Sequence, residues 1–65
     1  MTETQAIARA KRLARERGVV MAVVKMDAGP GREIRVVRDE YTYGPEFEAF
    51  RGVLLFEVHP CGDIN

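Results

Sequence analysis

The run VVMAVVKM at residues 19–26 decides the fold of this chain. Its odd and even positions are both apolar, apart from Lys25, whereas a strand with one solvated face alternates apolar and polar residues. The run therefore predicts a central strand that must be covered on both faces. One face can receive a helix, and the other needs a second cover, which a second subunit could supply.

The stretch before this run, residues 1–17, predicts an amphipathic helix. Thr2 followed by Gln5 matches a capping box, and Gly18 suits the left-handed position that ends a helix. At helical spacing one arc is apolar and rich in alanine, which lets the helix lie close to a sheet. The residues of this arc are Ala6, Ile7, Ala10, Leu13 and Ala14.

Two further strands are predicted, at residues 32–38 and 53–59. Residues 27–31 form a Gly-containing connection of hairpin length between the first two strands. The Gly-Pro-Gly sequence at 29–31 lacks the Lys-Ser/Thr pair of a phosphate-binding loop, so we expect only a hairpin tip. Residues 60–65 are expected to be a flexible tail.

Residues 39–52 are compatible with two conformations. Pro45 suits the first position of a helix and Gly52 the position after its end, which favours one or two helical turns. The Tyr, Thr and Phe residues in the same stretch also favour an extended chain, so a strand-like alternative stays open.

The order of these elements predicts one α+β domain spanning residues 1–65. Its N-terminal helix packs on a three-stranded, mainly antiparallel sheet, in the order α-β-β-(short α or loop)-β. If residues 19–26 are central, the last strand lies beside them and residues 39–52 cross over; a meander is the alternative. A domain this small buries only roughly 60% of its unfolded surface, so we expect a homodimer or a larger partner to add stability.

The composition excludes several other classes of protein. Cys61 is the single cysteine and His59 the single histidine, so they give neither a disulfide nor a four-ligand metal framework, and no cofactor is expected. Residues 1–18 lack the apolar segment of a secretory signal, and no run approaches the ~20 apolar residues that span a bilayer. These features favour a soluble, cytoplasmic protein without membrane association.

Catalysis is not expected either. The neighbouring carboxylates of Asp39 and Glu40, and those of Glu46 and Glu48, have nothing in the sequence that would enclose them for acid/base chemistry. A chain of 65 residues also leaves little room for an enclosed substrate pocket.

Acidic and aromatic residues gather between Arg38 and Arg51, where no basic residue occurs. Aromatic residues set among carboxylates suit contact with a basic protein surface, including a groove that normally holds nucleic acid. The competing interpretation is that the aromatic residues fill the core and the acids are merely solvated. The candidate protein-binding residues are Asp39, Glu40, Tyr41, Tyr43, Glu46, Phe47 and Glu48.

The exposed arc of the N-terminal helix is basic and offers an alternative, nucleic-acid-binding surface. Its candidate residues are Arg9, Lys11, Arg12 and Arg15. A solvated helix face is the simpler explanation of these residues, because the whole chain has a net charge of zero and no base-reading motif accompanies the helix.

These observations favour a small protein-binding module that acts by occupying its partner. One concrete form is an inhibitor or adaptor that binds a nucleic-acid-handling complex. Small antagonists encoded by phages and plasmids, including anti-CRISPR proteins, are comparable in size and lack of motifs. That comparison is one of type and rests on no residue match. A structural homodimer subunit is a further alternative.

Overall fold

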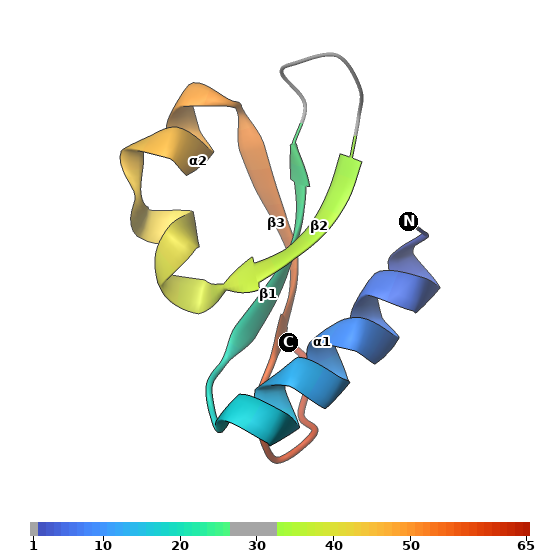
Figure 1. Cartoon of the computed structure of the whole chain (residues 1–65). Coiled ribbons are helices and arrows are strands. Elements are labelled where there is room, and N and C mark those ends of the chain that lie inside the picture. The colour runs from blue at the N-terminus through green and yellow to red at the C-terminus, as the bar shows by residue number, and fades with distance from the viewer. Residues whose placement is uncertain (1, 27–32) are drawn as a thin grey trace.

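Helix and strands follow the predicted order in the computed structural model, which describes residues 2–26 and 33–65. Met1 and the predicted hairpin tip at 29–31 lie outside the described residues. The elements are α1 (Glu3–Arg17), β1 (Met21–Met26), β2 (Glu33–Arg38), the 3-10 helix η1 (Asp39–Tyr43), α2 (Pro45–Ala49) and β3 (Gly52–Val58) (Figure 1). The predicted α+β architecture is therefore confirmed.

The sheet has the strand order β2-β1-β3, and both strand pairs are antiparallel. Val23 in the centre of β1 lies opposite Val36 on β2 and Phe56 on β3. The register with β3 shifts between Val23 and Val24, which leaves Leu55 as an extra residue in a β-bulge. Residues 39–51 thus cross over the central strand, as predicted, and the meander alternative is wrong.

The first face of the sheet is covered by α1. Thr2 Oγ1 accepts from the Gln5 backbone N–H at 3.2 Å, and Gln5 Oε1 accepts from the Thr2 N–H at 3.1 Å, so the predicted capping box is present. Gly18 closes the helix with φ of +64°. Three alanines of α1 are fully buried and pack with residues of β1 and β3 in one core cluster, whose buried members are Ala6, Ala10, Ala14, Met21, Val23 and Val58.

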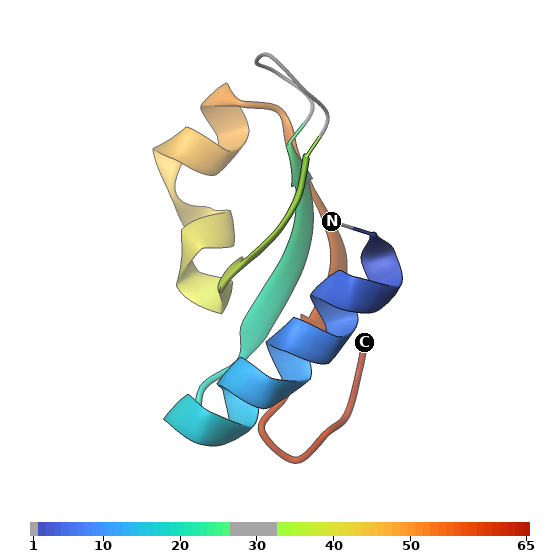
Figure 2. The ribbon, with the colours of Figure 1, turned by 45° about the vertical axis from the view of Figure 1, so that its right-hand side comes forward.

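The second face of the sheet is covered by η1 and α2, on the side away from α1 (Figure 2). Tyr41 and Phe47 pack over Ala22, Val24 and Met26 of β1. Their rings meet edge to face, with centroids 6.2 Å apart and an interplanar angle of 76°. The second cover that the sequence requires therefore comes from the chain's own residues.

Residues 39–49 adopt short helices, so the helical interpretation is confirmed over the extended one. The predicted role of Gly52 as the residue after the helix end is wrong. Arg51 takes the left-handed conformation there, with φ of +52°, and Gly52 opens β3. Glycine is needed at 52 for a different reason, because a Cβ at that position would overlap the Phe47 ring.

The last residues of the chain fold back along the outer edge of β3. Glu57 and Asn65 exchange two backbone hydrogen bonds of 2.9 Å, and the His59 N–H donates to the Asp63 carbonyl at 2.9 Å. Val58 and Ile64 form an isolated antiparallel β-bridge between β3 and the returning residues. These bonds cover the end of β3 that is furthest from α2, while the expected flexibility of residues 60–65 stays a prediction.

The core of the described residues is built from small side chains. Its largest fully buried side chains are those of Val23, Val24 and Val58. Larger apolar side chains remain strongly exposed, among them Tyr43, Phe50 and Leu54. Because burying large apolar side chains is the main source of folding free energy, a single copy of the chain gains less of this free energy than its sequence could supply.

Candidate protein-binding surface

Local hydrogen bonds fix η1 and α2 on the second face. The Asp39 backbone N–H donates to the Val20 carbonyl at 3.1 Å, which ties the start of η1 to the residue before β1. Thr42 Oγ1 donates to the Asp39 carbonyl at 2.7 Å, and the Gly44 N–H donates to the Tyr41 carbonyl at 3.1 Å. Pro45 then begins α2 without losing a hydrogen bond.

The seven predicted binding residues divide into two groups. Tyr41 and Phe47 are half-buried and anchor the segment to the sheet, and Asp39 is also half-buried. The other four form the exposed group, here called the acid–aromatic surface: Glu40, Tyr43, Glu46 and Glu48. Tyr43 leaves 77% of its surface exposed. The core interpretation of the aromatic residues therefore fits Tyr41 and Phe47, whereas Tyr43 is free to contact other molecules.

The charge of the acid–aromatic surface is only weakly offset by its neighbours. Arg38 Nη1 lies 3.5 Å from Glu40 Oε1, but both side chains are more than half exposed. Exposed pairs of this kind contribute at most about 1 kcal/mol and are screened by salt. Arg38 therefore holds the Glu40 carboxylate only weakly.

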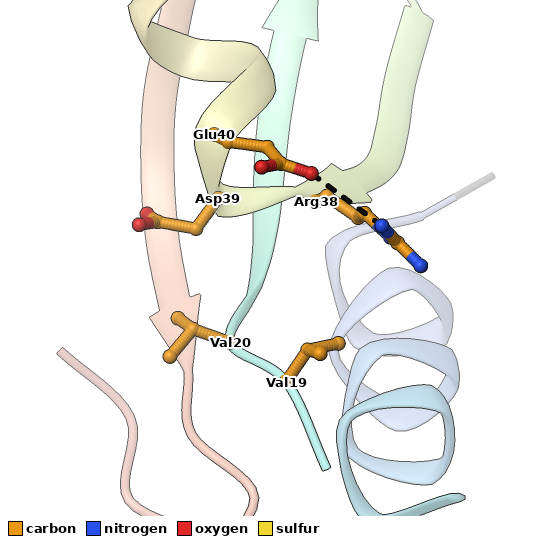
Figure 3. A pocket seen from close by; sticks show the side chains of 5 residues that line it. All are labelled: Val19, Val20, Arg38, Asp39 and Glu40. Carbon is orange, nitrogen blue, oxygen red and sulfur yellow. Dashed lines mark hydrogen bonds and ion pairs between the residues drawn. The ribbon is translucent and has the colours of Figure 1, made fainter. Parts of the chain in front are cut away.

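An open hollow of about 360 Å³ lies where η1 meets the start of β1. It is lined by Val19, Val20, Arg38, Asp39 and Glu40 (Figure 3). The Glu40 carboxylate points toward Arg38, whereas the Asp39 carboxylate points away from both (Figure 3). Asp39 Oδ1 is buried without a hydrogen-bond partner among the described residues. The two neighbouring carboxylates therefore point in different directions (Figure 3).

The basic candidates lie on the opposite side of the molecule. All four are exposed on α1, facing away from the sheet: Arg9, Lys11, Arg12 and Arg15. The fold thus places α1, which carries the basic residues, on one side of the sheet, and η1 and α2, which carry the acid–aromatic surface, on the other (Figure 2).

The C-terminal His-Cys pair gathers no further ligands within residues 2–26 and 33–65. Cys61 is exposed, and His59 Nε2 lies 3.1 Å from the Asn65 side-chain nitrogen, which can only donate. No group of three or more His, Cys, Asp and Glu residues in this part of the chain could hold a metal ion.

The sequence did not single out one exposed feature, the apolar end of β3. Val53 is 50% exposed and Leu54 41% exposed, and Phe50, which the core interpretation would bury, is 47% exposed. The available signal was the absence of charge at residues 52–56, which is unusual for an edge strand of a small sheet.

Comparisons with protein-family models, with curated proteins and with solved structures found no match for this chain. None of the described helices has the length and apolar character needed to cross a membrane. The exposed residues of η1, α2 and α1 are therefore the features that can indicate a function.

Proposed function

We propose that this protein is a non-enzymatic binding module whose acid–aromatic surface occupies a basic groove of a partner protein. The observation that carries the proposal is that some residues of 39–49 pack on the sheet while others are exposed. Tyr41 and Phe47 hold the segment on the sheet, while Tyr43 and the carboxylates of Glu40, Glu46 and Glu48 in the same segment are exposed. An exposed aromatic side chain on a fixed backbone, in a segment that also exposes charged residues, has the character of an interface anchor.

The carboxylates suit a groove that binds phosphates, because they present negative charge to the same Lys and Arg side chains. A module of this kind inhibits by occupancy, as a small antagonist of a nucleic-acid-handling complex would.

The test begins by isolating the partner with the tagged protein and identifying it by mass spectrometry. The affinity is then measured for the double variant Glu46→Lys/Glu48→Lys at several salt concentrations. We expect Kd to rise about tenfold to a hundredfold and to depend less on salt, because contacts between opposite charges are lost.

The matched control is Glu3→Lys/Glu16→Lys, which makes the same change in net charge at exposed positions of α1. Its Kd should stay close to that of the unaltered protein. Equal affinities for both double variants would reject the acid–aromatic surface as the contact. Tyr43→Ala should separately weaken binding by roughly tenfold, as expected for an interface anchor.

A second candidate function is nucleic-acid binding through α1, favoured by the joint exposure of its four basic residues. It predicts that DNA or RNA is retarded at low salt and released as salt rises. The triple variant Arg9→Ala/Arg12→Ala/Arg15→Ala should abolish the retardation. The absence of any retardation by the unaltered protein at low salt would exclude this function.

A further inference from the structure

The exposed charges of α1 have no partner of opposite sign within residues 2–26 and 33–65. Helix α1 carries five basic and two acidic residues, which gives it a net charge of +3. The ion pairs of the described residues are Arg35–Glu33 and Arg38–Glu40, and neither involves α1. Four exposed side chains of the helix, here called the basic face, are therefore available to a second molecule: Arg9, Lys11, Arg12 and Arg15.

The acid–aromatic surface has the opposite charge and is equally open. Residues 39–50 contain four carboxylates and no basic residue. Glu46 and Glu48 take part in no ion pair of the described residues, and Glu40 contacts only the exposed Arg38, at 3.5 Å. The chain thus exposes two surfaces of opposite charge, while its net charge is zero.

The two surfaces also match in the chemistry of their side chains. Three of the four residues of the basic face are arginines, and the acid–aromatic surface consists of three glutamates and Tyr43. A guanidinium group binds a carboxylate through two parallel hydrogen bonds and also stacks on an aromatic ring. Tyr43 is 77% exposed, so its ring is accessible for such stacking.

We propose that the acid–aromatic surface of one copy of the chain docks on the basic face of a second copy. The proposal goes beyond the proposed function, because it assigns a second occupant to the acid–aromatic surface and a binding role to the basic face. A bound partner and a neighbouring copy then exclude each other, since both need the same carboxylates. Self-association therefore withholds the protein from its partner.

The position of the two surfaces determines the form of the assembly. α1 lies on one side of the sheet and η1 and α2 lie on the other (Figure 2). A twofold dimer through either surface would bring like charges together, so the contact joins unlike surfaces. Each added copy leaves one surface of each kind open, and the contact can repeat to form an open stack. The zero net charge means that no long-range repulsion opposes this growth.

The contact is expected to be weak and sensitive to salt. Each exposed ion pair contributes little and is screened by dissolved ions. The screening length is about 30 Å at 0.01 M ionic strength and falls to a few ångströms, about 3 Å, at 1 M. We expect a Kd on the order of 100 µM at about 0.01 M ionic strength, and at least a tenfold higher Kd at about 0.5 M.

The first test is sedimentation velocity of the full chain at about 1 mM, a concentration well above the expected Kd. At low ionic strength the unaltered protein should form species larger than a dimer, and at about 0.5 M it should be mainly monomeric. A monomer at low ionic strength, or species that persist unchanged in high salt, would overturn the proposal.

Two variants that each remove one surface test the direction of the contact. Arg12→Gln/Arg15→Gln weakens the basic face, and Glu46→Gln/Glu48→Gln weakens the acid–aromatic surface. Alone, each should raise Kd for self-association by more than about tenfold. Mixed in equal amounts, they should form a one-to-one dimer that grows no further, because each variant supplies the surface that the other lacks.

The matched control removes the same charges at exposed positions outside both surfaces. It mixes Arg35→Gln/Arg51→Gln with Glu33→Gln/Asp63→Asn, and this mixture should still grow beyond a dimer. Identical behaviour of the two mixtures would show that net charge alone drives the association and would overturn the proposal. Circular dichroism of each variant verifies that it is folded.

The partner affinities distinguish this proposal from the proposed function. Glu46→Gln/Glu48→Gln should weaken both self-association and partner binding, whereas Arg12→Gln/Arg15→Gln should weaken self-association alone. If the first variant loses self-association and keeps its partner affinity, the proposed function is wrong and the stacking contact stands. If it loses partner affinity while the unaltered protein stays monomeric, only the stacking contact is wrong.

Discussion

Both faces of strand β1 are apolar, and the elements that cover these two faces pack on the strand in different ways. On one face, the 15-residue helix α1 approaches through alanine methyl groups that are fully buried. On the other, two short helices totalling ten residues, five in η1 and five in α2, approach through the rings of Tyr41 and Phe47. The first cover buries its alanines completely and leaves Ile7 and Leu13 partly buried. The second leaves large side chains outside, which is where we place the binding surface.

The largest effect is expected from enlarging a side chain under α1. Ala10→Leu inserts a branched side chain between the helix and β1, where no surface is exposed. We expect the free energy of unfolding to fall by about 3 kcal/mol, because a closely packed contact has no space to accept the added volume. Urea denaturation at low protein concentration measures this change.

The control for this variant lies on the other side of the same helix. Ala8 is exposed, so Ala8→Leu adds the same atoms without entering the contact. Its free energy of unfolding should change by less than about 0.5 kcal/mol. Similar losses for both variants would show that α1 is not closely packed on the sheet.

A smaller effect is expected under the second cover. Gly52→Ala places a Cβ against the Phe47 ring and should lower the free energy of unfolding by about 2 kcal/mol. Gly44→Ala is the matched control, because its Cβ would make only a 3.4 Å contact with the Tyr41 carbonyl and its φ is −85°. Equal stability of the two variants would mean that Phe47 moves aside freely and that the second cover is loosely held.

The smallest effects are expected where each cover ends. α1 ends at Gly18 with φ of +64°, whereas α2 is followed by Arg51 with φ of +52°. Gly18→Ala should therefore cost about 1 kcal/mol in unfolding free energy, because a Cβ is unfavourable in this conformation. Arg51→Gly should instead stabilise the protein by ~0.5 kcal/mol, after the greater flexibility of glycine in the unfolded chain is subtracted. Thermal denaturation should show a lower melting temperature for Gly18→Ala and a higher one for Arg51→Gly. A lower melting temperature for Arg51→Gly would contradict the comparison of the two helix ends.

Much of the fold was predictable because strong local signals agreed with one another. The capping box at Thr2 and Gln5 and the closing Gly18 defined α1 within two residues. The apolar positions on both faces of residues 19–26 placed β1 at the centre of the sheet. These features depend on neighbouring residues or on a simple period, which a single sequence displays.

The candidate surface was predictable only in part. Its composition identified residues 39–48, but the division between half-buried Tyr41 and exposed Tyr43 depends on which way η1 turns over β1. Gly52 was misassigned because the Phe47 ring that requires it comes from a tertiary contact. The exposure of Val53 and Leu54 likewise follows from β3 being an edge strand, a fact of topology that no local pattern contains.

The position of the two tyrosines has a consequence for spectroscopy. Both lie in η1, and the chain contains no tryptophan, so its intrinsic fluorescence comes from the second cover alone. α1 holds 15 of the 25 residues in the described helices, five more being in η1 and five in α2, so it contributes most of the helical signal in far-ultraviolet dichroism. Two optical signals therefore follow the two sides of the sheet separately without any added label, and comparing their transition curves measures how cooperatively the sides unfold.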